Sequence, residues 1–132
     1  DIYNAFGGQS DRYKAAVQIA QSVQQEYPNT VITGLSLGGG EAALASVATS
    51  LQAYTFNAAG VNPANYNVVG STSQITNYHV ATDPITLVQV LTPLPNALGT
   101  QVTLRPANPY YYLDPIAAHG SASVLASLGI NQ

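Results

Sequence analysis

The sequence contains no cysteine and very few charged residues. Of its 132 residues, 3 are Lys or Arg and 6 are Asp or Glu, which gives a formal net charge of -3. Nucleic-acid-binding faces and polybasic membrane anchors both depend on clusters of cations, so we expect no nucleic-acid partner and no such anchor. The lack of cysteine excludes disulfides, thiol chemistry and cysteine-ligated zinc.

Long hydrophobic runs are also missing. The longest apolar-leaning stretch, residues 42–51, is interrupted by hydroxyl side chains and is shorter than the ~20 residues of a membrane-spanning helix. No charged leader precedes an apolar run, so no signal peptide is visible. We therefore expect either that a leader has been removed or that the chain is part of a longer protein. The low charge and the lack of cysteine fit export, and we expect a secreted or exported bacterial protein.

The residues that are present suffice for one hydrophobic core. Hydrophobic residues make up 46% of the chain, and its length is in the usual range of one domain. We therefore expect residues 1–132 to form a single domain, which is either a fragment or a minimal version of its fold.

Hydrophobic spacing predicts alternating helices and strands. Short β-branched or aromatic runs predict strands at residues 30–35, 53–57, 74–80 and, with a weaker pattern, 101–104. Apolar residues at helical spacing predict helices at residues 10–27, 37–51 and 119–128. The proline-containing segment 83–98 is expected to be a loop. This order predicts an α/β fold with a mostly parallel sheet flanked by helices.

A Gly-x-Ser-x-Gly pentapeptide, residues 34–38, lies between a predicted strand and a predicted helix. This is the context of a nucleophile elbow, a tight turn that holds a serine in a strained conformation with its hydroxyl exposed. We expect a Cβ two residues before or after Ser36 to clash, which would explain Gly34 and Gly38. The backbone N–H of Leu37 would then bind the oxyanion. The alternative is a glycine-rich turn without chemical function.

A catalytic serine needs a base, and His79 and His119 are the two histidines of the chain. In the elbow fold the order is Ser, Asp or Glu, then His, with the partners beyond the carboxyl ends of strands. Asp83 follows a predicted strand and His119 comes later, so we predict Ser36 as nucleophile, Asp83 as acid and His119 as base. Asp114 is the rival acid. The alternatives are a turn-forming Asp83 and a surface His119.

The other acidic residues predict no metal site. Glu41 falls in the first turn of a predicted helix, where the helix dipole favours a carboxylate, and we interpret it as structural. The histidines and acids have no metal-ligand spacing. We therefore expect neither a metal nor a cofactor.

Several of these segments resemble a known family. TGLSLGGGEAALA resembles the elbow of class 3 lipases, and YTFNAAGVN followed by ITNYHVATDPI resembles the bacterial lipase-like branch of the α/β-hydrolase superfamily. The resemblance extends from about Asp11 to His119. It implies that the nucleophile is Ser36, the acid Asp83 and the base His119, and that the substrate is a lipid ester.

The sequence departs from this family at two points. Leu35 replaces a histidine that is not part of the triad. The strands that normally precede the first helix are missing, so we expect a reduced core without the loop that gives a second N–H to the oxyanion hole. One lost donor can cost ~2.7 to 4 kcal/mol of transition-state stabilisation, so activity would be weak unless residues 4–8 or another segment replaces it.

The sequence therefore predicts that the protein is a serine hydrolase of carboxylic esters, of the lipase, phospholipase or esterase type, which acts through an acyl-enzyme. Its substrate would be a lipid ester, at a membrane or micelle surface. The alternative is a weak or inactive lipase-like binding domain of a larger exported protein, whose exposed sheet edge pairs with a partner segment or a second copy. A peptidase or thioesterase on the same scaffold is a third reading.

Two further groups of side chains have less specific roles. Apolar residues within segment 85–98 would line an acyl-chain groove, form a lid or pack on the sheet. Tyr110, Tyr111 and Tyr112 would face lipid or cover the core.

Overall fold

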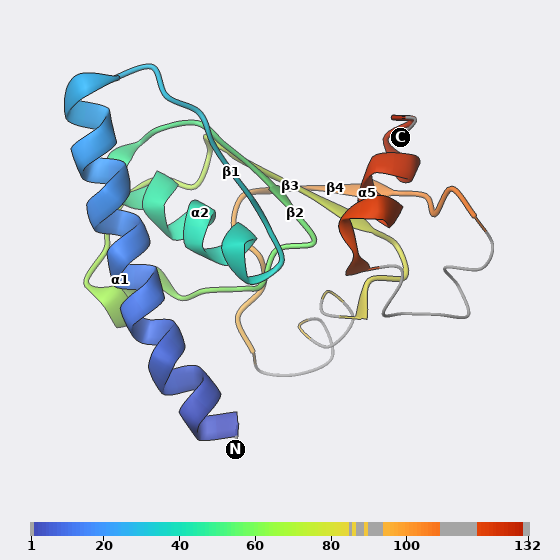
Figure 1. The fold of residues 1–132 in the computed structure, drawn as a ribbon, viewed down its shortest axis with the longest axis horizontal. Helices are drawn as coiled ribbons and strands as arrows, with labels where there is room; N and C mark the ends of the chain where they lie inside the picture. Colours follow the sequence, from blue (N-terminus) through green and yellow to red (C-terminus); the bar gives the residue numbers. More distant parts are fainter. Residues whose placement is uncertain (1, 85, 87–88, 90–93, 109–118, 131–132) are drawn as a thin grey trace.

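The computed structural model describes residues 2–84, 86, 89, 94–108 and 119–130. Helices and strands alternate along most of this part of the chain (Figure 1). The elements are α1 (Ile2–Glu26), β1 (Ile32–Leu35), α2 (Leu37–Thr49), β2 (Ala53–Phe56), the 3-10 helix η1 (Pro63–Tyr66), β3 (Ile75–Val80), β4 (Thr100–Leu104) and α5 (Ser121–Ser127).

The four strands form one parallel sheet in the order β1-β2-β3-β4. The last residue of β1, Leu35, pairs with Phe56, which pairs with Tyr78 of β3. The carboxyl ends of the strands therefore meet at one edge of the sheet. Helix α2 packs on β1 and β2, α1 lies along α2, and α5 contacts β3 (Figure 1). The predicted α/β fold with flanking helices is confirmed, with a reduced core in which α1 precedes the first strand.

Small side chains allow α2 to lie close to the sheet. One buried cluster joins Ala43 and Val47 of α2 to Ala53 of β2 and Ile75 of β3. Leu44, on the α2 face toward α1, is fully buried in a second cluster with aromatic and branched side chains. This packing fixes the N-terminus of α2, and the turn before it, against the strand ends.

The structure corrects the start of the first helix. The sequence analysis placed it at Ser10, whereas α1 begins at Ile2 and passes through Gly7 and Gly8. A glycine inside a helix costs about 1 kcal/mol relative to alanine but, unlike proline, removes no hydrogen bond. Ser10 is an N-cap residue type, but it lies within the helix.

A second correction concerns the segment predicted as a loop. Pro84, Thr86 and Gln89 are helical. Asp83 accepts the Thr86 N–H at 2.8 Å, which is the bond that an N-cap side chain makes to the third helical residue. Proline is favoured at the first helical position because it has no N–H to satisfy. The Asp-Pro pair therefore starts a helical turn here.

None of the helices in the described part of the chain combines the length and the apolar character that crossing a bilayer requires.

Candidate active site

Ser36 occupies a strained turn between β1 and α2. Its φ of 57° and ψ of -122° lie in a region of backbone angles that residues other than glycine rarely adopt. Two hydrogen bonds hold this turn: the Ser36 N–H donates to the Phe56 carbonyl at 3.0 Å, and the Ser36 carbonyl accepts the Ala59 N–H at 2.9 Å. The conformation expected of a nucleophile elbow is therefore present and anchored on the end of β2.

The glycines around Ser36 have unequal steric roles. A Cβ on Gly34 would lie 2.1 Å from the Gly38 carbonyl oxygen, so Gly34 has no room for a side chain. A Cβ on Gly38 would meet no atom within 4 Å, so the predicted clash at this position is wrong. Two later glycines have no room for a side chain. A Cβ on Gly39 would lie 2.7 Å from the Ala58 Cβ, and a Cβ on Gly40 would lie 2.4 Å from the Tyr13 hydroxyl oxygen. Which of these later glycines is confined depends on neighbours from the segment after β2 and from α1.

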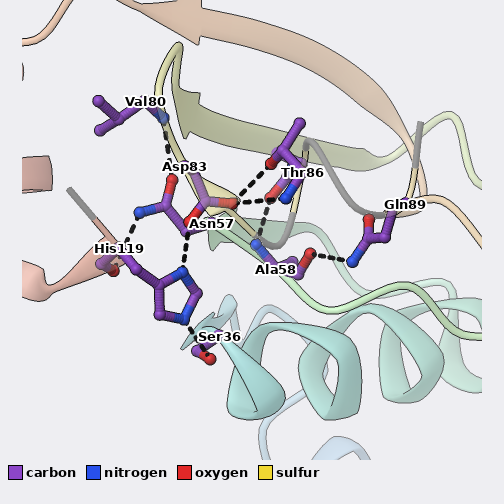
Figure 2. A network of polar contacts seen from close by, with 9 residues as sticks. Ser36, Asn57, Ala58, Val80, Asp83, Thr86, Gln89 and His119 are labelled. Carbon is purple, nitrogen blue, oxygen red and sulfur yellow. Dashed lines mark hydrogen bonds and ion pairs between the residues drawn. The ribbon is translucent and has the colours of Figure 1, made fainter. Parts of the chain in front are cut away.

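The three side chains predicted as a triad lie in one hydrogen-bonded chain (Figure 2). His119, just before α5, has its Nε2 2.6 Å from the Oγ of Ser36. Its Nδ1 is hydrogen bonded to Oδ1 of Asp83, which follows β3. Residues 83 positions apart in sequence thus meet at the carboxyl edge of the sheet.

Asp83 is held as a carboxylate although its side chain is completely buried. Its Oδ2 accepts the backbone N–H and the hydroxyl of Thr86, each at 2.8 Å. Burial alone would raise the pKa of Asp83, but the hydrogen bonds from His119 and Thr86 together lower it below its usual range. The ionised Oδ1 then accepts the Nδ1–H of His119, which leaves Nε2 as the acceptor for the Ser36 hydroxyl.

The second histidine lies away from this chain. Nε2 of His79, in β3, is 3.0 Å from the Thr103 hydroxyl of β4. Burial lowers the pKa of His79, and the nearby Asp83 charge opposes this shift. Among the contacts of the described residues, His79 makes no hydrogen bond to Ser36, whereas His119, the predicted base, does.

The remaining acids have other positions. Glu41 lies beyond the first turn of α2, so the predicted first-turn position is wrong; its carboxylate forms an ion pair with Arg12 of α1 at 2.9 Å instead. Asp114, the rival acid, lies outside the described residues. In the described parts of the chain, no cluster of three or more potential ligand side chains could hold a metal ion.

Leu37 is the first residue of α2, where a helix leaves its N–H groups without carbonyl partners inside the helix. The positive end of the helix dipole points to the same place. The N–H of Leu37 therefore lies at the positive end of α2, directly after Ser36. Residues 4–8, considered as a source of a second donor, are part of α1 and form no returning loop.

A cavity of about 580 Å³ opens beside Ser36 and Leu37. Its volume is typical of a pocket for a small organic molecule. Most of the lining is apolar or aromatic, and the tilted rings of Tyr13 and Tyr66, with centroids 5.2 Å apart, form one wall. The remaining lining residues are Ala59, Gly60, Val61, Asn62, Asn65, Pro84, Gln89, Leu94 and Pro95. The cavity therefore has space for an apolar group next to the serine.

Tyr13 is neutral in this wall. Burial raises its pKa to about 12, with smaller contributions from Tyr66 and Glu41. Among the described residues of the segment predicted as groove or lid, Leu94 lines the cavity, whereas Leu98 packs against the hydrophobic core. The other apolar residues of that prediction, which lie outside the described residues, are Ile85, Leu87, Val88, Val90 and Leu91. Tyr110, Tyr111 and Tyr112 also lie outside the described residues.

Two residues that hold the site together were not predicted from the sequence. Thr86 binds Asp83 through two hydrogen bonds, and the Asp-Pro-x-Thr sequence is an N-cap pattern that could have revealed it. Asn57 binds the segments that carry Asp83 and His119 (Figure 2). Asn57 lies in the segment YTFNAAGVN that carries the family resemblance, and asparagine tolerates a left-handed backbone after a strand, but neither signal indicates its partners.

The sequence is similar to that of known phospholipases. The family model described as a Tle-like phospholipase domain matches residues 1–108. The chain belongs to this phospholipase-like family. This membership confirms the prediction from sequence that the chain is lipase-like. The matched region includes Ser36 and Asp83 and ends before His119.

One curated relative is an extracellular phospholipase A1 of Serratia liquefaciens. The two proteins are 33% identical over 150 aligned positions, which cover 97% of this chain and 47% of the relative. The chain thus spans about half the length of the curated relative that it matches.

Proposed function

We propose that this Tle-like domain is a serine hydrolase that cleaves a carboxylic ester of a phospholipid. The observation that carries the proposal is the hydrogen-bonded chain from Ser36 through His119 to Asp83, whose Ser36 lines an apolar cavity. Family membership and the phospholipase A1 relative support the substrate class. At the level of superfamily, we assign the domain to the α/β-hydrolases, near the class 3 lipases, on the strength of its elbow.

The reaction follows from the hydrogen bonds. His119 Nε2 takes the proton of Ser36 as the serine oxygen attacks the ester carbonyl, and Asp83 stabilises the resulting imidazolium. The N–H of Leu37 binds the oxyanion. His119 returns the proton to the leaving alcohol, and water then cleaves the acyl-enzyme. No step requires a metal or a cofactor.

The substrate position follows from the cavity. Its apolar lining favours the acyl chain, so the more polar remainder of the ester would stay outside, at a membrane or micelle surface. The relative is extracellular, and we propose a secreted or exported location for this protein as well. We further propose that residues 1–132 act as one lipase-like domain.

The proposal is tested on vesicles of a phosphatidylcholine with different acyl chains at its two positions. We expect the chain to release fatty acid and lysophospholipid in equal amounts, predominantly from the sn-1 ester, and Ser36→Ala to release neither. Release of choline or phosphocholine instead of fatty acid would contradict the proposal. So would a Ser36→Ala variant as active as the unmodified chain.

A second candidate function, a binding domain, is favoured by the open edge of the sheet. Within the described strands β1 is an edge strand, and a groove of about 380 Å³ lies beside it, between α1, α2 and β1. Ile19 and Val31 of this groove are 64% and 51% exposed. A partner segment or a second copy would pair there. A folded chain that associates with a partner but releases no fatty acid would favour this candidate.

A further inference from the structure

Asn57 is a completely buried amide at the end of β2. Its φ of 43° lies in the left-handed region, which asparagine tolerates better than most residues. Its side chain uses both of its functions: Nδ2–H donates to the His119 carbonyl at 3.0 Å, and Oδ1 accepts the Val80 N–H at 2.9 Å (Figure 2).

These two bonds join the segments that carry the base and the acid. Val80 ends β3, and its carbonyl accepts the Asp83 N–H at 2.8 Å. Asn57 is therefore connected to Asp83 through the backbone of a single residue, Val80. The same amide holds the backbone of His119 itself. The preceding residue, Phe56, accepts the Ser36 N–H. The end of β2 therefore contacts all three segments that meet in the site.

We propose that Asn57 is a positioning residue, which fixes the His119 imidazole between Ser36 and Asp83. The inference rests on the proposed hydrolase function. Without the amide, the His119 backbone loses a buried partner, and its ring can move relative to Ser36. A misplacement of about 1 Å can lower a rate roughly 100-fold.

The position of Asn57 separates this role from substrate binding. Asn57 is not part of the cavity lining, whereas Ser36 and Leu37 are. Loss of the amide should therefore lower kcat and leave KM unchanged. In the unmodified chain, the Nδ1 proton of His119, which is hydrogen bonded to Asp83, should give a low-field signal in the NMR spectrum. Loss of the Asn57 amide should weaken this hydrogen bond and with it the signal.

The chain offers a matched control in Asn77 of β3. This amide is also buried, at 1% exposure, and its bonds go to Thr55, Ala58 and Gln101 rather than to the His119 segment. Asn57→Gly keeps the left-handed backbone free of strain, and Asn77→Ala removes a comparable buried amide. Both variants should lower the melting temperature, because each leaves buried groups unsatisfied.

The test compares kcat, KM and the low-field proton signal of both variants, measured well below their melting temperatures. We expect Asn57→Gly to lose about 100-fold in kcat at unchanged KM and to lose the proton signal, while Asn77→Ala keeps kcat within about threefold and keeps the signal. Equal losses of kcat in both variants, or an Asn57→Gly variant with kcat within threefold of the unmodified chain, would overturn the proposal.

If Asn57→Gly does not fold, Asn57→Asp replaces it, because this variant keeps the acceptor for the Val80 N–H and removes the donor to His119. The same loss of kcat is then expected, and its absence overturns the proposal. An unmodified chain without hydrolytic activity would refute the proposed function itself. In that case the proton signal still decides whether Asn57 positions His119: its loss in the Asn57 variant and not in Asn77→Ala supports the inference, and its persistence overturns it.

Discussion

Replacement of Asp83 by asparagine is expected to lower kcat by about 10⁴-fold, the loss associated with the wrong imidazole tautomer. The Thr86 N–H, which points at Oδ2, can only donate. The new amide must therefore turn its oxygen toward Thr86 and its NH₂ toward His119. His119 would then accept at Nδ1 and carry its proton at Nε2, where it cannot take the Ser36 proton.

Steady-state hydrolysis of a soluble short-chain ester measures this effect, with circular dichroism to show that the variant is folded. Thr86→Val is the matched control, because it removes one hydroxyl bond to Asp83 and keeps the N–H. We expect it to lose far less activity. An Asp83→Asn variant within tenfold of the unmodified chain would show that Asp83 does not orient the base.

Thr86→Val should also change the dependence of stability on pH. The folded state holds the pKa of Asp83 below its usual range, so Asp83 contributes stability above the unfolded-state pKa that is lost as pH falls through the folded-state pKa. Removing one hydrogen bond raises the folded-state pKa. Acid unfolding of Thr86→Val should therefore begin at a higher pH than that of the unmodified chain.

Gly34→Ala is expected to destabilise the protein strongly and to inactivate it. The added Cβ would lie 2.1 Å from the carbonyl oxygen of Gly38 and 2.9 Å from the Gly39 nitrogen, so the backbone of the turn must move. Overpacking of this kind costs about 1–3 kcal/mol, which corresponds to a fall of roughly 10 °C in melting temperature at the upper end. The displaced turn would also move Ser36 away from His119.

Gly38→Ala is the control for this prediction. Its Cβ meets no atom within 4 Å, and alanine is the better helix former at this position in α2. We expect an unchanged or slightly higher melting temperature in thermal unfolding followed by circular dichroism. Equal destabilisation by both substitutions would contradict the steric account of the turn.

The parts of the site that follow from chain order were predictable from sequence. Ser36 and Asp83 each lie just beyond the end of a strand, and a parallel sheet brings such ends to one edge. His119 was predicted from chain order, because it is the histidine that comes after Asp83. The first three strands were also predictable, because short β-branched or aromatic runs between glycine- and proline-containing turns leave few alternatives, whereas the pattern of β4 was weaker.

The parts that depend on neighbours distant in sequence were not predictable. Whether Gly34 or Gly38 is confined depends on which backbone approaches it, and spacing alone treats the two alike. Asn57 gains its role from partners 23 and 62 residues away, which no local pattern encodes. The helical turn at Pro84 was missed because proline was interpreted as a loop signal rather than as a first helical residue following an N-cap.

The reactivity of Ser36 tests the central claim most directly. The unmodified chain, Ser36→Ala and His119→Ala are each incubated with a fluorophosphonate probe, and their intact masses are measured, with circular dichroism to establish folding. The account predicts one adduct on the unmodified chain, mapped to Ser36, and none on either variant. A folded unmodified chain that stays unlabelled, or an adduct on a different hydroxyl, would contradict it.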